Sequence, residues 1–331
     1  MNLTTCLCYL LVHVMSFCGS AVSLQDMASD DMAGPAKVFV GVYLNQIHEV
    51  NLKENRFTAD FWIWFRWTDT DLKPIETFEL TNGQIESKEG VTQWEKEGLN
   101  YAACRVVASV TKFWDTSDFP LDNHRLSLEV EDGENEMHKL VYVADSANCG
   151  FDPSVQIPGW KPCNALNQID VHKYKTNYGD ITLPTSKESA YSRFQFSVDA
   201  MRPGFGYFAK LFSGLFVSTL VAFLAFLMKP DLEEARFGLG VGSLFAAVAS
   251  QYVVSSALPD TQLVTLVDKL HVAALIFIML SMFESTLSVW LASSDKEKLA
   301  VLLDRWSFII FLSFFVILTI VIVLGRSAQP V

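Results

Sequence analysis

Hydrophobic and polar positions follow one pattern before Arg202 and another after it. Before Arg202, segments such as RFTADFWIWFRWTD (56–69), HRLSLEVED (124–132) and SRFQFSVDAMR (192–202) are strand-like, the last two alternating apolar and polar side chains with period two. The first is rich in aromatics and bounded by turn-prone residues. Several such strands separated by turn signals predict an antiparallel β-sandwich, which we assign to residues 24–202.

After Arg202 the apolar runs become long enough to cross a bilayer. The runs from Leu211 to Met228, Phe237 to Pro259 and Trp306 to Gly325 contain no charged residue. A further segment from Thr261 to Ser293 holds Asp268, Lys269 and Glu284, and ionisable residues within a span usually face protein or water. Residues 203–331 are therefore expected to form a transmembrane bundle of four helices, at about 204–228, 235–257, 261–293 and 301–326.

The N-terminus resembles a cleaved secretory signal. An apolar stretch from Leu7 to Phe17 precedes small residues suited to a signal peptidase, so residues 1–23 are expected to be removed. A short N-terminal anchor is the alternative, although the stretch is well under the ~20 residues of a spanning helix. The basic residues near the predicted inner loops agree with a sandwich outside a plasma (inner) membrane that the chain crosses several times; they are Lys229, Arg236, Lys296, Lys298 and Arg305.

Composition narrows the chemistry. Half of the 331 residues are hydrophobic and the net charge is −12, values typical of folded domains. Without the signal peptide the remaining cysteines are Cys104, Cys149 and Cys163; the last two bracket a turn-rich segment and are either joined in a disulfide or unlinked thiols. The cysteine spacing does not suit a metal site, and we expect no metal, cofactor or nucleic-acid partner.

Catalytic motifs are absent from the sequence. It contains no GxSxG, HExxH or glycine-rich phosphate loop, and its histidines are scattered. Glu129 and Glu131 share one face of a predicted strand, but a solvated charged face explains them better than an acid/base pair. The sequence therefore does not predict an enzyme.

The segment DLEEARFGLGVGSLFAAVASQYVVSSALPD (231–260) is rich in glycine, alanine and serine where a lipid-facing helix would carry leucine. Steps of three and four residues place one set of its side chains on a single helical stripe. The stripe consists of Glu234, Gly238, Gly242, Phe245, Ala249, Tyr252 and Ser256. Small residues either leave room for water along this face or bring two helices into close contact.

The segment KFWDTSDFPLDNHRL (112–126) resembles the signature loop of the pentameric ligand-gated ion channels, the Cys-loop receptor family, with Phe119, Pro120 and Asp122 as its matching core. The two cysteines that name the loop would fall at Lys112 and Leu126, so this copy cannot form that bridge. This departure and the short link between the third and fourth helices are similar to prokaryotic-type members.

Other matches follow in the family's order. WFRWTD supplies a Trp-x-Asp at Trp67 and Asp69, MRP supplies an arginine at Arg202, and EARFGLG and ALPD resemble the start and the outer end of the family's pore helix. The resemblance covers about residues 37–325, and the combination is more specific than any single motif.

This resemblance implies that the second helix of each of five subunits lines a central pore with the stripe that begins at Glu234. A ring of Glu234 carboxylates at the inner mouth would favour cations, and anion-selective relatives carry a proline at that position. Phe245 is the preferred gate, because a ring of phenylalanines can expel water from a constriction. Tyr252 is the second choice, since its hydroxyl offers water a partner.

The resemblance also implies a small agonist, an amine or an aromatic compound, in a box of aromatic side chains between adjacent sandwiches. Where the family usually contributes one of these aromatics, this chain reads Glu131-Asp132-Gly133, and the acids could pair with a cationic ligand or be solvated. The expected ligand-binding residues are Trp62, Tyr101, Glu131, Tyr174, Tyr178 and Tyr191.

The family's coupling zone, which transmits ligand binding to the pore, would here contain Val50, Lys53, Phe119, Pro120, Asp122, Arg202 and Pro259. Asp122 and Arg202 could pair at the membrane boundary, where they either transmit motion or merely hold two domains together. The sequence thus favours a ligand-gated, cation-selective channel that assembles as a homopentamer and contacts membrane lipid. The alternative is a non-conducting, membrane-anchored ligand-binding or auxiliary receptor protein.

Overall fold

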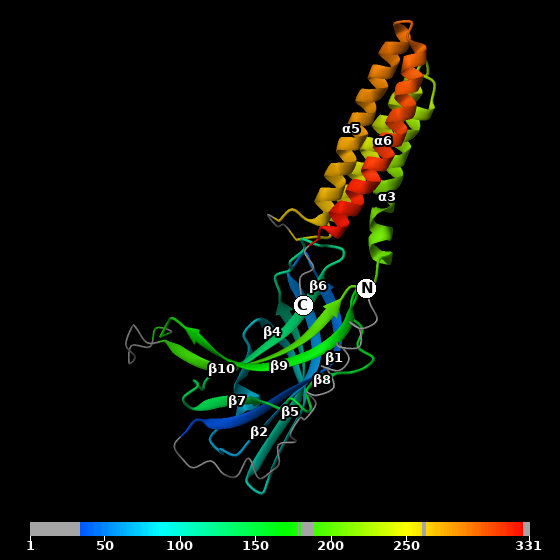
Figure 1. The fold of residues 1–331 in the computed structure, drawn as a ribbon. Helices are drawn as coiled ribbons and strands as arrows, with labels where there is room; N and C mark the ends of the chain where they lie inside the picture. The colour runs from blue at the N-terminus through cyan, green and yellow to red at the C-terminus, as the bar shows by residue number, and fades with distance from the viewer. Residues whose placement is uncertain (1–33, 178, 180–187, 260–262, 327–331) are drawn as a thin grey trace, which may run out of the picture.

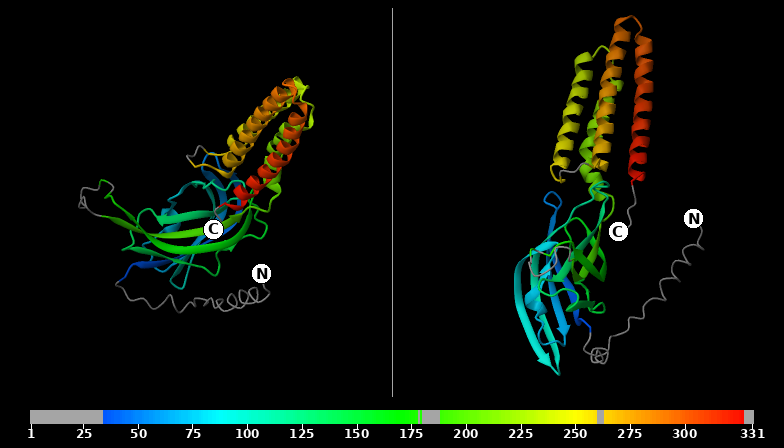
Figure 2. Two further views of the ribbon diagram at one scale, coloured as in Figure 1. Left: turned by 45° about the horizontal axis from the view of Figure 1, so that its top comes forward. Right: turned by 90° about the vertical axis from the view of Figure 1, so that its left-hand side faces the viewer.

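The computed structural model describes residues 34–177, 179, 188–259 and 263–326, and the expected signal peptide at 1–23 lies outside them. Two stacked sheets form a sandwich, and helices extend from one end of it (Figures 1 and 2). One sheet has the strand order β4-β5-β2-β1-β7, with β8 beside β1, and the other has the order β3-β6-β10-β9. The predicted sandwich is confirmed, and it also contains two short parallel pairings, of β7 and β8 with β1.

The strands of the first sheet are β1 (Ala36–Asn51), β2 (Arg56–Trp67), β4 (Gly83–Lys96), β5 (Leu99–Thr111), β7 (Leu140–Ala144) and β8 (Gly150–Phe151). Those of the second sheet are β3 (Phe78–Leu80), β6 (Asn123–Asp132), β9 (Lys161–Tyr174) and β10 (Ser189–Met201). A short helix, α2 (Pro74–Thr77), lies between β2 and β3 in the chain.

Strand β2 shows why the sequence pattern folds this way. Phe61, Ile63 and Phe65 are fully buried in the sandwich core, whereas Trp62 between them is 37% exposed on the outer face. Alternate residues of a strand point to opposite faces, so this segment supplies aromatic side chains both to the core and to the outer surface of the sandwich. The β4–β5 hairpin turns at Glu97 and Gly98, both with positive φ, as a two-residue turn of matching twist requires.

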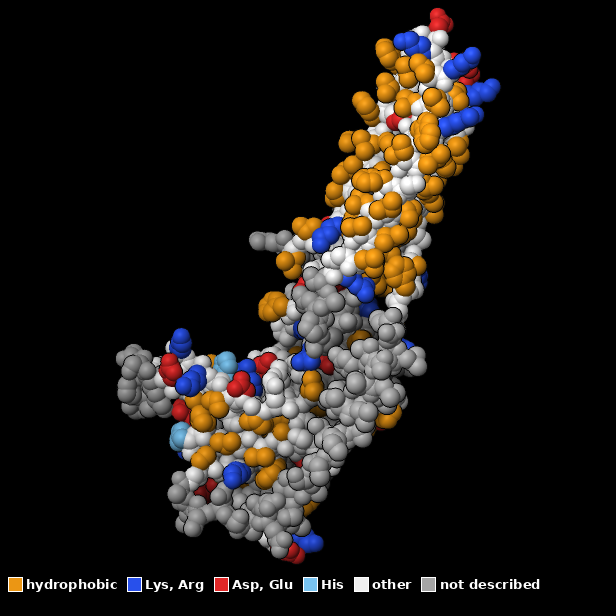
Figure 3. Space-filling view, viewed as in Figure 1, with side chains coloured by type: hydrophobic (Ala, Val, Ile, Leu, Met, Phe, Trp, Pro, Cys, Tyr) orange, Lys and Arg blue, Asp and Glu red, His pale blue; other side chains and the backbone are white. Residues whose placement is uncertain are grey.

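The helices are α3 (Gly206–Phe223), continued by the 3-10 turn η2 (Leu224–Leu227), α4 (Glu233–Ser255), α5 (Leu266–Ser293) and α6 (Glu297–Leu324). Each of the four spans is long and apolar enough to cross a membrane. Figure 3 shows hydrophobic side chains covering the visible face of the helices, with charged side chains gathered at the end far from the sandwich. The expected multi-pass membrane protein is confirmed.

The helix limits differ from the sequence-based ones for local reasons. Helix α5 begins at Leu266, five residues after the expected start, because Thr265 and Asp268 form a capping box: the Thr265 hydroxyl accepts from the Asp268 amide, and the Asp268 carboxylate accepts from the Thr265 amide. Asp268 is therefore a helix cap and not an ionisable group deep in the span. Helix α6 begins four residues earlier than expected, at Glu297, so its first turns extend well before the uncharged run that starts at Trp306.

Candidate functional site

Helix α4 presents the predicted stripe on one free face of the subunit. All seven stripe residues are exposed on the single chain, and the exposed fractions of Phe245 and Tyr252 are 71% and 76%. Six of them lie within the helix, and Ser256 forms its C-terminal cap. The opposite face is packed against the bundle through Gly240, Ser243 and Ala247. The small residues of the stripe thus do not serve a helix contact within the subunit.

Arg236 lies behind this face. Its side chain is fully buried, and its Nη2 donates to Asp304 Oδ1 at 2.5 Å, while Nη1 donates to Ser288 Oγ at 3.0 Å. Glu284 Oε2 is 3.9 Å from the same Nη2. The arginine that complicated the charge of the inner mouth is therefore held between α5 and α6, on the far side of α4 from Glu234. Sequence analysis missed Asp304 because it set the start of the last apolar run after it.

The segment 112–126, here called the signature loop, joins the sandwich to the helices. Phe119 is 2% exposed and belongs to the hydrophobic cluster of the helical bundle, and its ring meets Tyr207 of α3 edge-on at 6.2 Å. The Leu266 amide at the start of α5 donates to the Ser117 carbonyl at 2.8 Å. The peptide bond before Pro120 is cis. Contacts to both α3 and α5 thus pass through this one loop.

The predicted pairing of Asp122 with Arg202 is present. Arg202 Nε donates to Asp122 Oδ1 at 3.2 Å, and the second carboxylate oxygen lies 2.5 Å from His124 Nε2. All three side chains are buried. Burial by itself would raise the pKa of Asp122, but the hydrogen bond from His124 and the charge of Arg202 outweigh it and lower that pKa.

Sequence analysis did not assign Trp160 to this network. The guanidinium carbon of Arg202 lies 3.7 Å from the centre of the Trp160 ring, a cation–π contact, and Arg202 Nη1 also donates to the Gly159 carbonyl. Trp160 stands in the turn-rich segment before β9, so only the folded chain brings it near Arg202.

The other residues expected in the coupling zone lie near the same junction. Val50 is the last residue but one of β1 and is partly buried against the sandwich core, while Lys53 is exposed in the β1–β2 turn. Leu52 between them packs against both the sandwich core and the helical cluster. Pro259 is buried after α4.

Two of the predicted agonist-site tyrosines, Tyr174 and Tyr191, lie on the second sheet. Tyr174, at the end of β9, meets Tyr191 of β10 edge-on with ring centres 5.8 Å apart, and the His172 ring meets Tyr174 edge-on at 4.5 Å. Tyr178 lies outside the described residues. Burial, followed by hydrogen bonding to Glu131, raises the pKa of Tyr174 to about 12, so its hydroxyl stays protonated.

Glu131 is not free to meet a ligand, which corrects its expected role. It is 1% exposed, and its carboxylate accepts from Arg193 Nε at 2.6 Å and from the Tyr174 hydroxyl at 3.0 Å. Arg193 also bonds Glu129 at 2.7 Å. Two acids and one arginine thus form a support behind the tyrosines. Alternation places each of the three side chains on a face of its own strand, but only the register of β6 with β10 brings them together.

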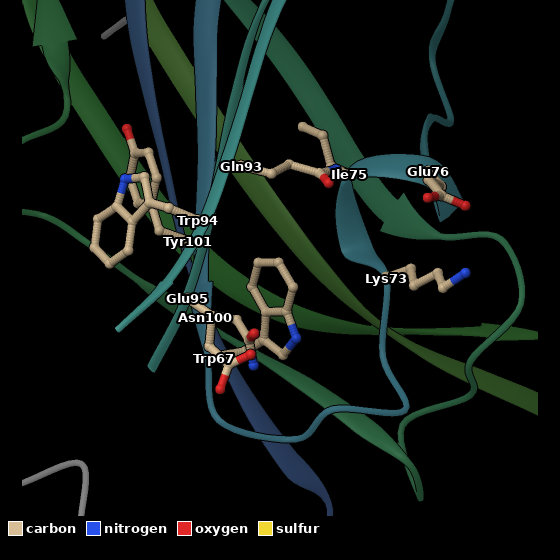
Figure 4. A pocket seen from close by; sticks show the side chains of 9 residues that line it. All are labelled: Trp67, Lys73, Ile75, Glu76, Gln93, Trp94, Glu95, Asn100 and Tyr101. Carbon is tan, nitrogen blue, oxygen red and sulfur yellow. The ribbon is translucent and has the colours of Figure 1, made fainter. Parts of the chain in front are cut away.

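Trp62 and Tyr101, both expected among the ligand-binding residues, are separated along the first sheet. Trp62 pairs with Arg105 of β5, whereas Tyr101 pairs with Arg66, four residues farther along β2. Tyr101 stacks on Trp94 at 4.9 Å and lines a cavity of about 290 Å³ near α2, together with Trp67 and Lys73 (Figure 4). Tyr101 therefore belongs to this hollow and not to a box around Trp62.

The cysteines of the described chain are free thiols, so the alternative without a disulfide holds for Cys149 and Cys163. Cys149 is half-buried beside β1 and Cys163 is exposed on β9. Burial raises the pKa values of Cys104 and Cys149 to about 11, which leaves both largely unreactive at neutral pH.

A β-sandwich joined by a signature loop to four helices that are long and apolar enough to span a membrane matches the fold of the Cys-loop receptors. Comparison with known proteins agrees, although no protein-family model matches the chain. It is 21% identical over 280 residues to the gamma-aminobutyric acid receptor subunit theta of Mus musculus, covering 76% of this chain and 41% of that protein.

The chain is also 20% identical over 277 residues to the glycine receptor subunit beta of Rattus norvegicus and of Homo sapiens, covering 76% of this chain and 54% of those proteins. The chain spans about half the length of the curated relatives it matches. These matches confirm the resemblance to the Cys-loop receptor family that the motifs indicated.

Proposed function

We propose that this protein is a ligand-gated ion channel, formed by five copies of the chain, that selects cations and opens when a small agonist binds between adjacent sandwiches. The observation that carries the proposal is the face of α4, where every predicted pore residue from Glu234 to Ser256 is exposed while the opposite face is packed. Five such faces around an axis would enclose a path lined by small side chains and narrowed at Phe245.

Cation selectivity follows from Glu234 at the inner end of α4. Glu233 and Glu234 both lie in the first turn of the helix, where a negative charge is stabilised by the helix dipole. Five copies of Glu234 would concentrate cations at the mouth. The proline of anion-selective relatives is replaced by this carboxylate, so we do not transfer an anion preference from relatives.

The agonist is proposed to be an amine or an aromatic compound recognised by ring faces and not by an acid. Tyr174 and Tyr191 on one subunit and Trp62 on its neighbour offer such faces, while Glu131 is occupied by Arg193. Binding would shift the population toward the open pore only where the agonist binds that state more tightly. The contacts of Arg202 and the signature loop with α3 and α5 provide the connection.

The test is the current carried by the purified full chain in planar bilayers under a salt gradient. Phe245→Ala removes the proposed constriction and is expected to conduct without agonist, with a reversal potential on the cation side. Adding Glu234→Gln should move that potential toward zero. A folded pentamer of Phe245→Ala that carries no current would favour the non-conducting receptor, and a conducting Tyr252→Ala beside a silent Phe245→Ala would relocate the gate.

A further inference from the structure

Arg236 and Glu234 are close in sequence and opposite in charge, yet the helix separates them. Residues two apart on an α-helix point about 200° from one another, so Glu234 is exposed on the proposed pore face while Arg236 is buried on the other side. Without this separation each pore carboxylate would face a cation of the same subunit, and the inner mouth would have little net charge.

Two carboxylates on two other helices lie beside Arg236, and one of them is hydrogen-bonded to it. Asp304 of α6 bonds Nη2 at 2.5 Å, and Glu284 of α5 lies 3.9 Å from the same nitrogen; these side chains are only 4% and 7% exposed. Ser288, one turn after Glu284, accepts from Nη1. The guanidinium is thus both neutralised and oriented by groups that do not reach the pore face.

We propose that Asp304 and Glu284 are positioning residues for ion selection: they hold Arg236 behind the pore wall, so that no cation of the same subunit opposes the Glu234 carboxylate at the inner mouth. An arginine without these partners would extend its long side chain toward the nearest water, as exposed arginines do. For a subunit in the proposed assembly, that water is at the inner mouth. The role rests on the proposed channel function, but the field itself can be measured without current.

The probe is a cysteine at Gly238, one turn above Glu234, where a Cβ meets no atom within 4 Å. Position 238 lies on the inner side of Phe245, so a reagent entering from the inner mouth need not pass the proposed gate. The measurement is the ratio of modification rates by a cationic and an anionic methanethiosulfonate on the full-length pentamer in detergent. Peptide mass separates this cysteine from exposed Cys163.

In the Asp304→Asn/Glu284→Gln variant five arginine charges act together on each reagent, so we expect the cationic-to-anionic rate ratio to fall about tenfold. Adding Arg236→Gln should restore the ratio to within about twofold of the parent, because no unpaired cation remains. Asp295→Asn is the matched control: it removes a carboxylate from the exposed α5–α6 turn, and the ratio should not change.

An unchanged ratio in an assembled Asp304→Asn/Glu284→Gln pentamer would overturn the proposal, as would a triple variant that fails to restore it. If the first variant does not assemble, the rate ratio is measured on Arg236→Gln/Asp304→Asn, which removes one positive and one negative charge together and so leaves no unpaired arginine. Its ratio should stay within about twofold of the parent; a rise of about tenfold would mean that Arg236 already acts on the pore. Absence of current in both the Phe245→Ala and the Tyr252→Ala channels would refute the proposed function and leave this field measurement valid.

Discussion

The contact between Asp122 and Arg202 makes a quantitative prediction about the junction of sandwich and helices. Their side chains are 2% and 7% exposed, with Nε and Oδ1 3.2 Å apart, and Arg202 also stacks on Trp160. The perturbation is a double-mutant cycle of Asp122→Asn and Arg202→Gln. If the two charges stabilise each other, the double variant should lose less stability than the two single variants added together.

The expected magnitudes follow from the surroundings of each group. Breaking a buried ion pair costs about 3–5 kcal/mol. Asp122→Asn should fall at about 3 kcal/mol, since Arg202 keeps Trp160 and the Gly159 carbonyl as partners. Arg202→Gln should reach about 4 kcal/mol, since the cation–π contact is also lost. We expect a coupling free energy of about 2 kcal/mol between the two sites.

The assay is denaturant unfolding of the full chain in detergent, followed by tryptophan fluorescence, because Trp114 and Trp160 both lie against His124 in this network. The control is the same cycle on Arg125 and Asp199, where Arg125 is 41% exposed and the coupling should be under about 1 kcal/mol. If the unfolding free energies lost in the two single variants add up to the loss in the double variant within about 0.5 kcal/mol, the two charges do not stabilise each other and the prediction is refuted.

Three further results are expected from the sandwich. The pKa of Asp122 is lower in the folded protein than in the unfolded chain, so its ionisation stabilises the fold above pH values of about 4, its unfolded pKa. This contribution is lost as the pH falls through the folded pKa. Asp122→Asn should therefore make the free energy of unfolding less dependent on pH in the acid range, and an unchanged dependence would contradict the prediction. Glu131→Gln should cost about 2 kcal/mol by weakening a buried charged hydrogen bond, whereas a change below about 0.5 kcal/mol in thermal denaturation would point to a solvated acid. A thiol reagent at pH 8 should modify Cys163 well before Cys104 and Cys149, and a reductant should not change the melting temperature. A protein mass lower by two hydrogen atoms, with Cys149 and Cys163 joined in one peptide pair, would show a disulfide instead.

Features with a local physical signature could be predicted from the sequence. Period-two alternation gave the strands, because burying one face of a sheet dictates it residue by residue. The stripe on α4 could be predicted in the same way, since steps of three and four fix a helical face whatever the helix packs against. The pairing of Asp122 with Arg202 needed more than periodicity, because these residues are 80 positions apart, and it was reached through the resemblance to a known family.

Features that depend on strand register could not be predicted. Glu131 was considered for a ligand because it stands where the family usually contributes an aromatic to the agonist site, and Arg193 reaches it only through the pairing of β6 with β10. Trp62 and Tyr101 were grouped as aromatics, but the β2–β5 register places Tyr101 opposite Arg66 and Trp62 opposite Arg105. A period of two tells which face a residue occupies, and not how far along the sheet it lies.

The acids near the predicted spans show how much a charge pattern leaves open. By sequence, Asp268 and Glu284 were equivalent signs that one helix packs in a bundle, and Asp304 fell outside the next apolar run. In the structure Asp268 caps the first turn of α5, while Glu284 and Asp304 approach the same guanidinium from two helices. The role of an ionisable residue in a span can therefore be assigned only when its partner is known. The partner that hydrogen-bonds Arg236 is Asp304, which lies just before the uncharged run that marked the last span. The selectivity that we propose for the inner mouth thus rests on side chains that are buried away from it.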